Sequence, residues 1–356
     1  MDSSGLTSNP EILMKILKLS NNCISNYKEL SSLLIAKQSI DVVRAIISDS
    51  LWTNASELID QLKELYKRYR TQFGPYEDII CNIFKRTLKL IREECARISD
   101  QVETADLPLS IMELLLPEGY KNLLDVPRVN LEDDIIDAID EISTELENST
   151  DELIKNASEI IHEDDRIMTF GFSPTLIRIF KESSKRYNFT LMMIKNTGKD
   201  DMLEKFISNF STEKIQVVIV PYSNISSMLA LTDKVICPAK SLLSNGSVRS
   251  TAGLRMLAEL ANSRRVPVII VAGSHKLWDK YPPFKCNMNE FRHRINSGSL
   301  MEKPNMFIGD QIILRYAFDY VPYSSIDLIV SNIGKFAPSR LFSISNELYS
   351  LEDVDI

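Results

Sequence analysis

Six short apolar runs alternate with stretches of helical character in the second half of this chain. The runs lie at 167–171, 189–195, 215–221, 234–239, 267–273 and 327–332. The helical stretches follow at 175–185, 202–210, 223–231, 251–262 and 339–349. Strands that are apolar along their whole length are typical of a parallel sheet buried on both faces. The alternation therefore predicts an α/β fold with a mainly parallel sheet that helices cover on both sides.

The first hundred residues differ, because they contain amphipathic patterns with almost no glycine or proline inside them. Apolar residues recur at helical spacing around 12–17, 42–51, 58–66 and 79–95. Prolines interrupt residues 100–130, and a long amphipathic helix is predicted from 131 to about 162, with a possible break at 148–150. The predicted organisation is an N-terminal helical domain, a long acidic connecting helix and a C-terminal domain. Their boundaries are 1–125, 126–162 and 163–356.

The formal net charge is −8, so the chain lacks the basic surplus that a general nucleic-acid binder needs. The acidic residues are concentrated in one segment: residues 101–160 contain three basic and sixteen acidic residues. A solvated helix face explains this segment. An electrostatic contact with a basic partner is the alternative.

Five widely spaced cysteines without a CxxC motif disfavour a disulfide framework or a structural zinc site. No apolar run approaches the roughly 20 residues that span a bilayer. The N-terminal sequence MDSSGLTSNPE has neither the basic nor the apolar region of a signal peptide. We therefore expect a cytosolic location, with no membrane association, no cofactor and no metal.

The sharpest local signal is the sequence SNGSVRSTAG at 244–253. Asn245 and Gly246 predict a turn, and Ser250 or Thr251 is expected to cap the helix that follows. A turn and a helix start explain the pattern, and an anion site at the helix N-terminus is the alternative. No GxGxxG or GxxxxGK[ST] motif follows a strand, so neither a dinucleotide site nor a P-loop is predicted.

Several motifs occur in a fixed order in the second half of the chain. They are KVICPAK at 234–240, SNGS at 244–247, VIIVAGSHKL at 268–277, FDYVP at 318–322, DLIVSNIG at 327–334 and NELY at 346–349. This set resembles the regulatory alpha, beta and delta subunits of eukaryotic translation initiation factor 2B, and the beta type most. The resemblance is clear over about 130–356 and looser over the helical first part.

The resemblance implies that the C-terminal domain is Rossmann-like and that the chain is a non-catalytic regulatory subunit. Its complex would be the guanine nucleotide exchange factor for translation initiation factor 2, which responds to phosphorylation of the substrate's alpha subunit. The implied partners are the alpha, gamma, delta and epsilon subunits, and initiation factor 2 through its alpha subunit. A delta-type regulatory subunit is an alternative.

A second alternative is a sugar-phosphate isomerase, such as methylthioribose-1-phosphate isomerase, because these enzymes share the fold of the family. The resemblance implies that such enzymes carry a cysteine after the first strand and an aspartate before the Asn-Gly loop. Gly171 and Lys240 stand at these positions. Glycine has no side chain and lysine reverses the charge, so neither can do the acid–base work. We therefore predict no catalytic residues.

We expect the C-terminal domain to form the core of the complex through its sheet-end loops and last helix, and the helical domain to face the substrate's alpha subunit. The contact candidates are Asn245, Gly246, Arg249, Lys276, Asp319, Tyr320, Asn332, Gly334 and Lys335, together with the loop 278–294. Lys335 stands where the family has the second glycine of a turn. A positive φ at this lysine would cost about 1–2 kcal/mol.

Overall fold

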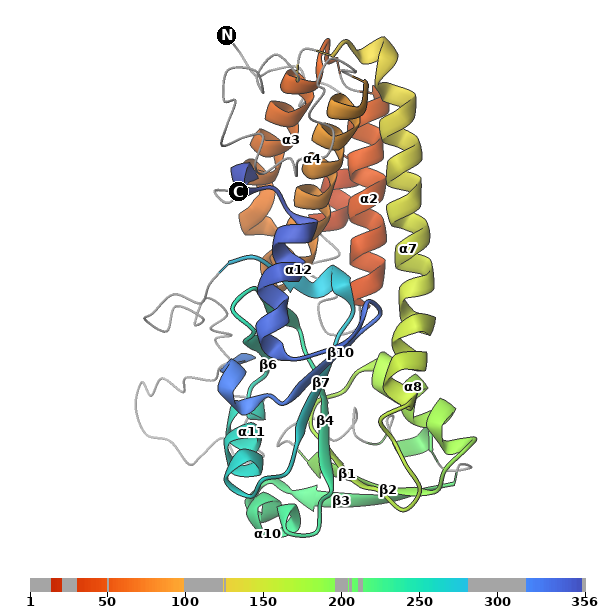
Figure 1. The fold of residues 1–356 in the computed structure, drawn as a ribbon, viewed down its shortest axis with the longest axis vertical. Coiled ribbons are helices and arrows are strands. Elements are labelled where there is room, and N and C mark those ends of the chain that lie inside the picture. Colours follow the sequence, from red (N-terminus) through yellow and green to blue (C-terminus); the bar gives the residue numbers. More distant parts are fainter. Residues whose placement is uncertain are drawn as a thin grey trace, which may run out of the picture. The chain divides into compact units, whose positions relative to one another are not determined.

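The computed structural model describes residues 14–20, 31–49, 51–98, 124, 126–195, 204, 207–210, 214–280 and 318–353 (Figure 1). The chain divides into two compact units. The first, called the helical unit, comprises 1–148, 275–279 and 343–356. The second, called the sheet unit, comprises 149–274 and 280–342. The predicted domain boundaries at 125 and 162 stay a prediction.

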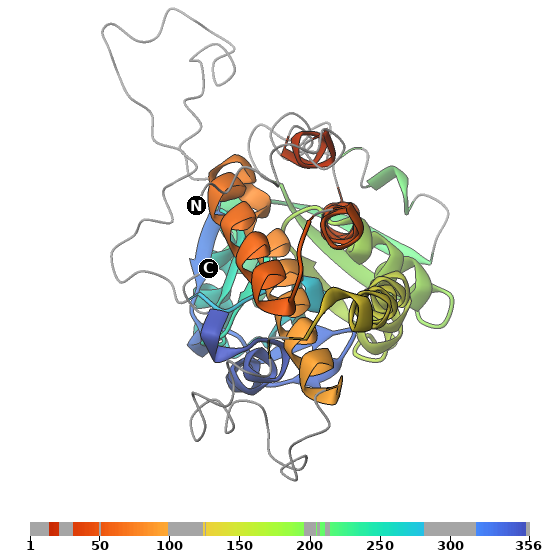
Figure 2. The ribbon, with the colours of Figure 1, turned by 90° about the horizontal axis from the view of Figure 1, so that it is seen from above.

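The helical unit is built from long amphipathic helices that pack along their lengths. They are α2 (Ser32–Asp49), α3 (Ala55–Tyr69), α4 (Glu77–Ile98) and the first part of α7 (Glu132–Ser158), which Figure 2 shows nearly end-on in yellow. They confirm the helices predicted at 42–51, 58–66 and 79–95, whereas the pattern at 12–17 lies partly outside the described residues. Asn54 caps α3 by accepting a hydrogen bond from the amide of Glu57, as its residue type predicts.

The core of the helical unit explains why these patterns fold as helices. Ile46 of α2, Leu62 of α3, Leu88 of α4 and Ile139 of α7 are completely or almost completely buried in one apolar cluster. Each lies on the apolar face of its helix, which withdraws it from water.

The predicted break at 148–150 is wrong, because α7 is continuous from Glu132 to Ser158. Leu146 and Leu153, two turns apart on one face, are both buried. Their spacing keeps the apolar stripe in register across 148–150, so nothing favours leaving the helix there.

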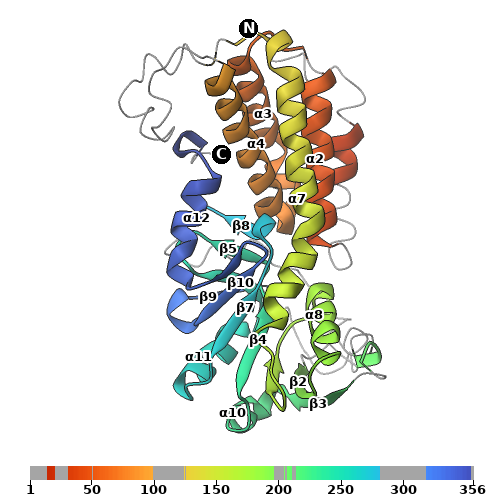
Figure 3. The ribbon, with the colours of Figure 1, turned by 45° about the vertical axis from the view of Figure 1, so that its right-hand side comes forward.

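A seven-stranded sheet forms the centre of the sheet unit within the described residues, in the order β11-β10-β7-β4-β1-β2-β3 (Figure 3). The strands are β1 (Arg166–Thr169), β2 (Phe189–Lys195), β3 (Ile215–Pro221), β4 (Lys234–Pro238), β7 (Val268–Val271), β10 (Leu328–Ser331) and β11 (Gly334–Phe336). All the pairings are parallel except that of β10 with β11. The prediction of a mainly parallel sheet is confirmed.

Helices cover both faces of this sheet. The helices α8 (Pro174–Ser184), α10 (Ile225–Leu229) and α11 (Leu254–Ser263) follow β1, β3 and β6 along the chain. Along β4, Ile236 joins the cluster that includes α8 and the end of α7, whereas its neighbours Val235 and Cys237 are buried outside that cluster. Both faces of β4 are therefore buried, which explains its almost continuous apolar sequence.

A smaller antiparallel arrangement lies beside the main sheet. Its strands β5 (Ser241–Leu243) and β9 (Phe318–Val321) both pair with β6 (Val248–Thr251). The described residues also form the strand β8 (Leu277–Trp278) and the helix α12 (Leu341–Leu348). Among the described helices, none is both long enough and apolar enough to cross a bilayer.

Candidate functional site

The carboxyl ends of β1 and β4 lie side by side where the strand order changes direction. From β1 the chain proceeds to β2 and β3 on one side, and β4, β7 and β10 follow on the other. In open parallel sheets, ligands bind at such a switch point. The loops that begin with Gly171 and Ala239 flank it, as the sequence predicts, and this edge is the candidate site.

A glycine and a buried cysteine lie at the switch point. Gly171 follows β1 with φ +93°, and a Cβ there would lie 3.4 Å from the Thr251 Oγ1 atom. Cys237 is completely buried nearby, and its sulfur accepts a hydrogen bond from the Phe170 amide at 3.3 Å. Burial raises the pKa of the Cys237 thiol to about 12, despite the lowering effect of that amide. Since the thiolate is the reactive form of cysteine, this buried thiol is inert at neutral pH.

The loop at 244–247 forms the turn that its sequence predicts, between β5 and β6. The Asn245 side chain accepts a hydrogen bond from the Ser247 amide at 3.1 Å and donates one to the Tyr320 hydroxyl at 3.1 Å. Tyr320 in turn donates to the Ser247 hydroxyl. Gly246 has φ +87°, and a Cβ there would lie 2.8 Å from the Pro338 carbonyl oxygen. Only glycine fits this position.

The expectation that Ser250 or Thr251 caps α11 is wrong. Both residues belong to β6, where the Ser250 hydroxyl donates to the carbonyl of Pro238 at 2.7 Å. Gly253 occupies the N-cap position instead, with φ +108°. Its left-handed backbone lets the chain leave the strand and enter the helix within two residues, a path that a serine or threonine cap would resist.

A carboxylate of the chain itself occupies the start of α11. Asp319 of β9 accepts a hydrogen bond from the Gly253 amide at 2.6 Å. Burial and the Asp319 charge both raise the pKa of the neighbouring Tyr222, which keeps its hydroxyl protonated. A helix N-terminus attracts anions, and here the anion is an aspartate. The sequence allowed an anion site at this helix N-terminus as an alternative. The Asp319 carboxylate occupies at least part of that site.

Arg249 lies inside the sheet unit rather than on its surface. Its guanidinium group donates to the Ser241 hydroxyl at 3.0 Å and lies 5.2 Å from the centre of the Phe318 ring. The residue is 7% exposed. It pairs with Tyr320 across β6 and β9, so it supports the strand that carries Asp319 and Tyr320.

Asn332, Gly334 and Lys335 meet at the β10–β11 hairpin. The buried Asn332 side chain accepts hydrogen bonds from the Ser274 amide at 2.8 Å and the Ser331 hydroxyl at 3.0 Å. Gly334 carries φ +144°, whereas Lys335 lies in β11 and has no positive φ. Lys335 therefore carries no strain from a positive φ, because the preceding residue, Gly334, adopts the positive φ of this turn. The Lys335 ammonium group instead pairs with Glu159 at 2.6 Å.

Lys276 does not join these groups, because it belongs to the helical unit. Burial lowers the pKa of its ammonium group to about 8, against the raising effect of the Asp78 charge. The loop 278–294 lies outside the described residues beyond Lys280.

The structure therefore brings the candidates together as two groups in the sheet unit. One comprises Asn245, Gly246, Arg249, Asp319 and Tyr320, and the other comprises Asn332, Gly334 and Lys335. Sequence reasoning missed Ser247 and Pro338, which complete the first group. Their roles depend on contacts with segments about 75 to 90 residues away, so no local pattern could have indicated them.

Several acidic residues of α7 pair with bases of the same chain. Glu147 pairs with Lys37 at 2.8 Å and Asp151 with Arg178 at 2.7 Å. Asp140 and Glu145 pair with Arg44 and Arg86. These contacts favour the solvated-face explanation, since intrachain bases already balance much of the charge.

Asn332→Ala is expected to weaken the sheet unit by about 1–3 kcal/mol. The substitution leaves the buried amide of Ser274 without its acceptor. Urea unfolding of the full chain measures the loss. Lys335→Ala is the control, because its ion pair with Glu159 is exposed and contributes little to stability. Equal effects of the two substitutions would contradict this assignment.

No group of three or more His, Cys, Asp or Glu residues in the described ranges could hold a metal ion. Cys81, Cys95 and Cys237 are buried and form no disulfide.

Sequence comparison identifies relatives over nearly the whole chain. The model of the initiation factor 2 subunit family matches residues 28–338. The chain is 24% identical over 359 residues to "Translation initiation factor eIF2B subunit beta" of Dictyostelium discoideum, covering 90% of this chain and 91% of the relative. It is 23% identical over 380 residues to the Schizosaccharomyces pombe protein of the same name, covering 90% and 92%. A ribose 1,5-bisphosphate isomerase of Haloferax volcanii is 21% identical over 225 residues, covering 62% and 67%.

Solved structures share the fold. The crystal structure of eIF2B beta from Chaetomium thermophilum has a TM-score of 0.70 at 19% identity, over 99% of this chain and 95% of that one. The tetrameric eIF2B-beta2-delta2 complex from the same organism gives 0.68 at 18% identity, over 97% of each chain. These findings confirm the predicted fold class and the resemblance to beta-type regulatory subunits. Because the family model covers most of the sequence, this chain belongs to the initiation factor 2 subunit family.

Proposed function

We propose that this chain is a beta-type regulatory subunit of the guanine nucleotide exchange complex for translation initiation factor 2. It acts by assembling with the other subunits and by docking the substrate's alpha subunit, without a catalytic site of its own, in the cytosol. Family membership and the two relatives named as beta subunits support this assignment.

The non-catalytic part of the proposal depends on the glycine that lies just beyond the end of β1. Gly171 lies where the isomerases of this fold are expected to carry a nucleophile. Lys240, where an aspartate is expected, follows β4, and its backbone amide donates to the Arg249 carbonyl at 2.8 Å. Cys237 is the nearby thiol, but it is buried and protonated at neutral pH. An acid–base pair cannot be assembled from these groups.

Partner binding is assigned to the two groups of loop residues at the edge of the sheet. Asn245 and Tyr320 form one, and the β10–β11 hairpin forms the other. Tyr323 is 58% exposed and Ile333 is 52% exposed, so each group has an apolar neighbour in contact with water. Subunit interfaces are enriched in aromatic side chains such as Tyr323, and their buried centres are more apolar than the rest of the surface. The tetramer formed by the beta and delta subunits of a relative is consistent with this assignment.

The mass of the native complex, with its subunits identified, tests the proposal. The chain is purified under native conditions from its source cells, and the mass is measured by native mass spectrometry. We expect a large hetero-oligomer that contains other exchange-factor subunits. A free-standing protein, or a complex without such subunits, would contradict the proposal. Reconstitution with each candidate partner then distinguishes a beta-type from a delta-type subunit.

Similarity to a ribose 1,5-bisphosphate isomerase keeps an enzymatic alternative open. A turnover assay with ribose phosphates decides it. We expect no turnover, because the switch point lacks an acid–base pair. Turnover that Lys240→Ala abolishes and Lys335→Ala preserves would establish the isomerase alternative instead.

A further inference from the structure

Polar residues form a continuous stripe along one face of α4. They are Asp78, Asn82, Lys85, Lys89 and Arg92, spaced alternately by four and three residues. That spacing places all five side chains on the same face of the helix. Lys85 is 1% exposed and Arg92 is 3% exposed. Long cationic side chains are almost never fully buried unless they are paired, so this face is built to meet specific partners.

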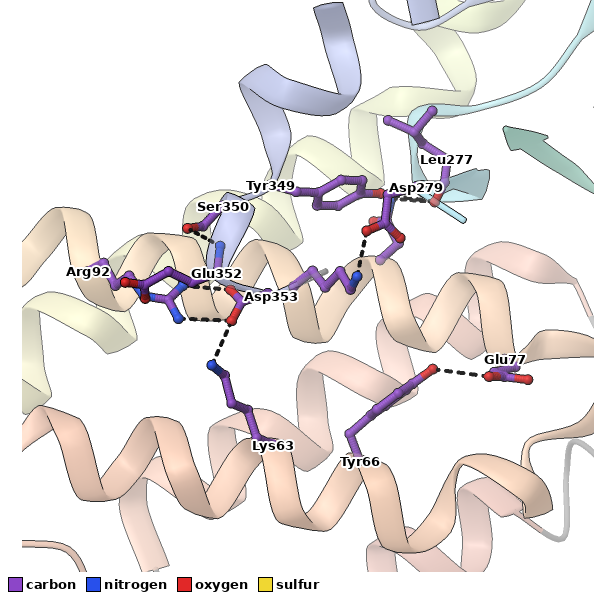
Figure 4. Close-up of polar contacts among 12 residues, drawn as sticks. Lys63, Tyr66, Glu77, Arg92, Leu277, Asp279, Tyr349, Ser350, Glu352 and Asp353 are labelled. Carbon is purple, nitrogen blue, oxygen red and sulfur yellow. Dashed lines mark hydrogen bonds and ion pairs between the residues drawn. The ribbon is translucent and has the colours of Figure 1, made fainter. Parts of the chain in front are cut away.

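The first partners come from residues 275–279 and from Tyr349, all within the helical unit. The Lys85 ammonium group pairs with the Asp279 carboxylate at 2.5 Å. The Asn82 side-chain amide donates to the Leu277 carbonyl at 3.1 Å and to the Tyr349 hydroxyl at 2.6 Å. Tyr349 also donates to the Leu277 carbonyl at 2.9 Å, as Figure 4 shows.

Asp353 is the most completely enclosed of the partners, with no exposed surface. Both of its oxygens accept hydrogen bonds from the Arg92 guanidinium group, at 2.6 and 2.8 Å. The Lys63 ammonium group of α3 lies 3.0 Å from the same carboxylate (Figure 4). Glu352 adds a second carboxylate, 3.0 Å from the Arg92 Nε atom. Planar, two-point pairing of this kind is geometrically specific.

The titration of Asp353 agrees with this geometry. Burial alone would raise the pKa of the Asp353 carboxyl, but the hydrogen bonds and charges of Arg92 and Lys63 outweigh it, and the pKa lies below its usual value. The carboxylate is therefore ionised at neutral pH and balances two cations. Without it, Arg92 would keep its ion pair with the partly exposed Glu352, and Lys63 would lose the carboxylate that lies 3.0 Å from its ammonium group.

These contacts join parts of the chain that are far apart in sequence. Asp353 follows Arg92 by 261 residues. The residues of α3 and α4 are therefore synthesised long before their partners at 347–353. Until then, the cations of the stripe have no counter-charge from 347–353, and buried unpaired cations are strongly unfavourable. The Lys89 side chain, which donates to the Glu347 carbonyl, extends the contact to the end of α12.

We propose that residues 347–353, which we call the acidic latch, complete the helical unit and act as a check on chain integrity. The helical unit stays unfinished until synthesis has passed Asp353, so a chain interrupted earlier fails to present a stable helical surface. The inference does not depend on the proposed function, because it concerns only contacts within this unit.

Hydrogen exchange of the full chain, read residue by residue, tests the latch. Asp353→Asn keeps the shape of the side chain but removes the charge that Arg92 and Lys63 share. We expect amides of α3 and α4 to exchange roughly 100-fold faster than in the parent chain, because breaking a buried ion pair is costly. Amides of β1, β4 and β7 are expected to keep their protection.

The matched control is Glu147→Gln, which removes an exposed ion pair of the same unit. It is expected to change exchange in α3 and α4 by less than about fivefold. Asp353→Asn that behaves like Glu147→Gln would overturn the inference. Equal loss of protection in the sheet strands would also overturn it, since the effect would then be general unfolding.

A chain that ends at Leu348 provides the second variant, because it lacks Tyr349 and Asp353 together. We expect its α3 and α4 amides to be at least as unprotected as in Asp353→Asn, with the sheet strands still protected. A truncated chain whose helices keep the protection of the parent would show that the latch is dispensable, and the proposal would fail.

Discussion

Arg92→Met is expected to destabilise the helical unit by about 3 kcal/mol or more. Methionine matches the length of the arginine stem but leaves the fully buried Asp353 carboxylate with Lys63 as its remaining cation. Removing one partner of a buried pair leaves a charge without adequate compensation, which costs about 3–5 kcal/mol. Urea unfolding at pH 7, followed by the circular dichroism of the helices, measures the change.

Arg166→Met is the matched control, because Arg166 also pairs with an aspartate through two side-chain contacts. That pair is exposed, with side-chain exposures of 45% for Arg166 and 39% for Asp233. Its removal is expected to cost much less than the loss of Arg92, because an exposed ion pair contributes little to stability. If the two substitutions cost the same, burial of the Arg92–Asp353 pair does not control its contribution.

The pH dependence gives an independent check of the same contact. Because the folded-state pKa of Asp353 lies below its unfolded value of about 3.9, its contribution to stability is complete above that value. The contribution is lost as the pH falls through the lowered, folded-state pKa. We therefore expect the difference in unfolding free energy between the parent chain and Arg92→Met to shrink from pH 7 to pH 3. A difference that stays constant would contradict the pairing.

Gly253→Ala is the second large expected effect, a loss of about 3 kcal/mol in the sheet unit. The residue has φ +108°, and an added Cβ would lie 2.8 Å from the Phe170 ring and 2.9 Å from the Tyr222 hydroxyl. A side chain at positive φ costs about 1–2 kcal/mol, and overpacking adds about 1–3 kcal/mol. Displacing Gly253 would also strain its hydrogen bond to Asp319. Exchange protection of β4 and β7 measures the loss.

Gly334→Ala separates backbone strain from overpacking. Gly334 also has a positive φ, but a Cβ there would meet nothing within 4 Å. We expect it to cost only the backbone term, so that Gly253→Ala exceeds it by about 1–3 kcal/mol. Shortening the clashing ring with Phe170→Leu should recover part of the excess in the double variant. Strictly additive effects of Gly253→Ala and Phe170→Leu would rule out the clash.

The fold could be predicted because its signals are local. The apolar runs at 189–195, 215–221 and 234–239 became β2, β3 and β4 with almost the same boundaries. A strand that is buried on both faces, such as β4, needs apolar residues at nearly every position, so the sequence carries the signal without knowledge of the partners. The helices of the first hundred residues could be predicted equally well, since one face of each is apolar at helical spacing.

The candidate site was predicted only in part. The resemblance placed Asn245, Tyr320 and Asn332 near the edge of the sheet, and the structure shows that Asn245 contacts Tyr320. The predicted cap of α11 was wrong. The amide of Gly253, at the start of the helix, donates a hydrogen bond to Asp319, which lies 66 residues further along the chain. The resemblance could not indicate that Arg249 is buried, since its neighbour Phe318 comes from a strand far along the chain.

By itself, the sequence determined the long helices, the strands of the main parallel sheet and the family, because each depends on the order of residue types along the chain. Only the tertiary structure decided that residues 343–356 belong with the N-terminal helices, where Asp353 neutralises Arg92. Charge balance across 261 residues leaves no trace in local spacing. It arises only when folding brings the two side chains together out of water, where an unpaired charge is costly.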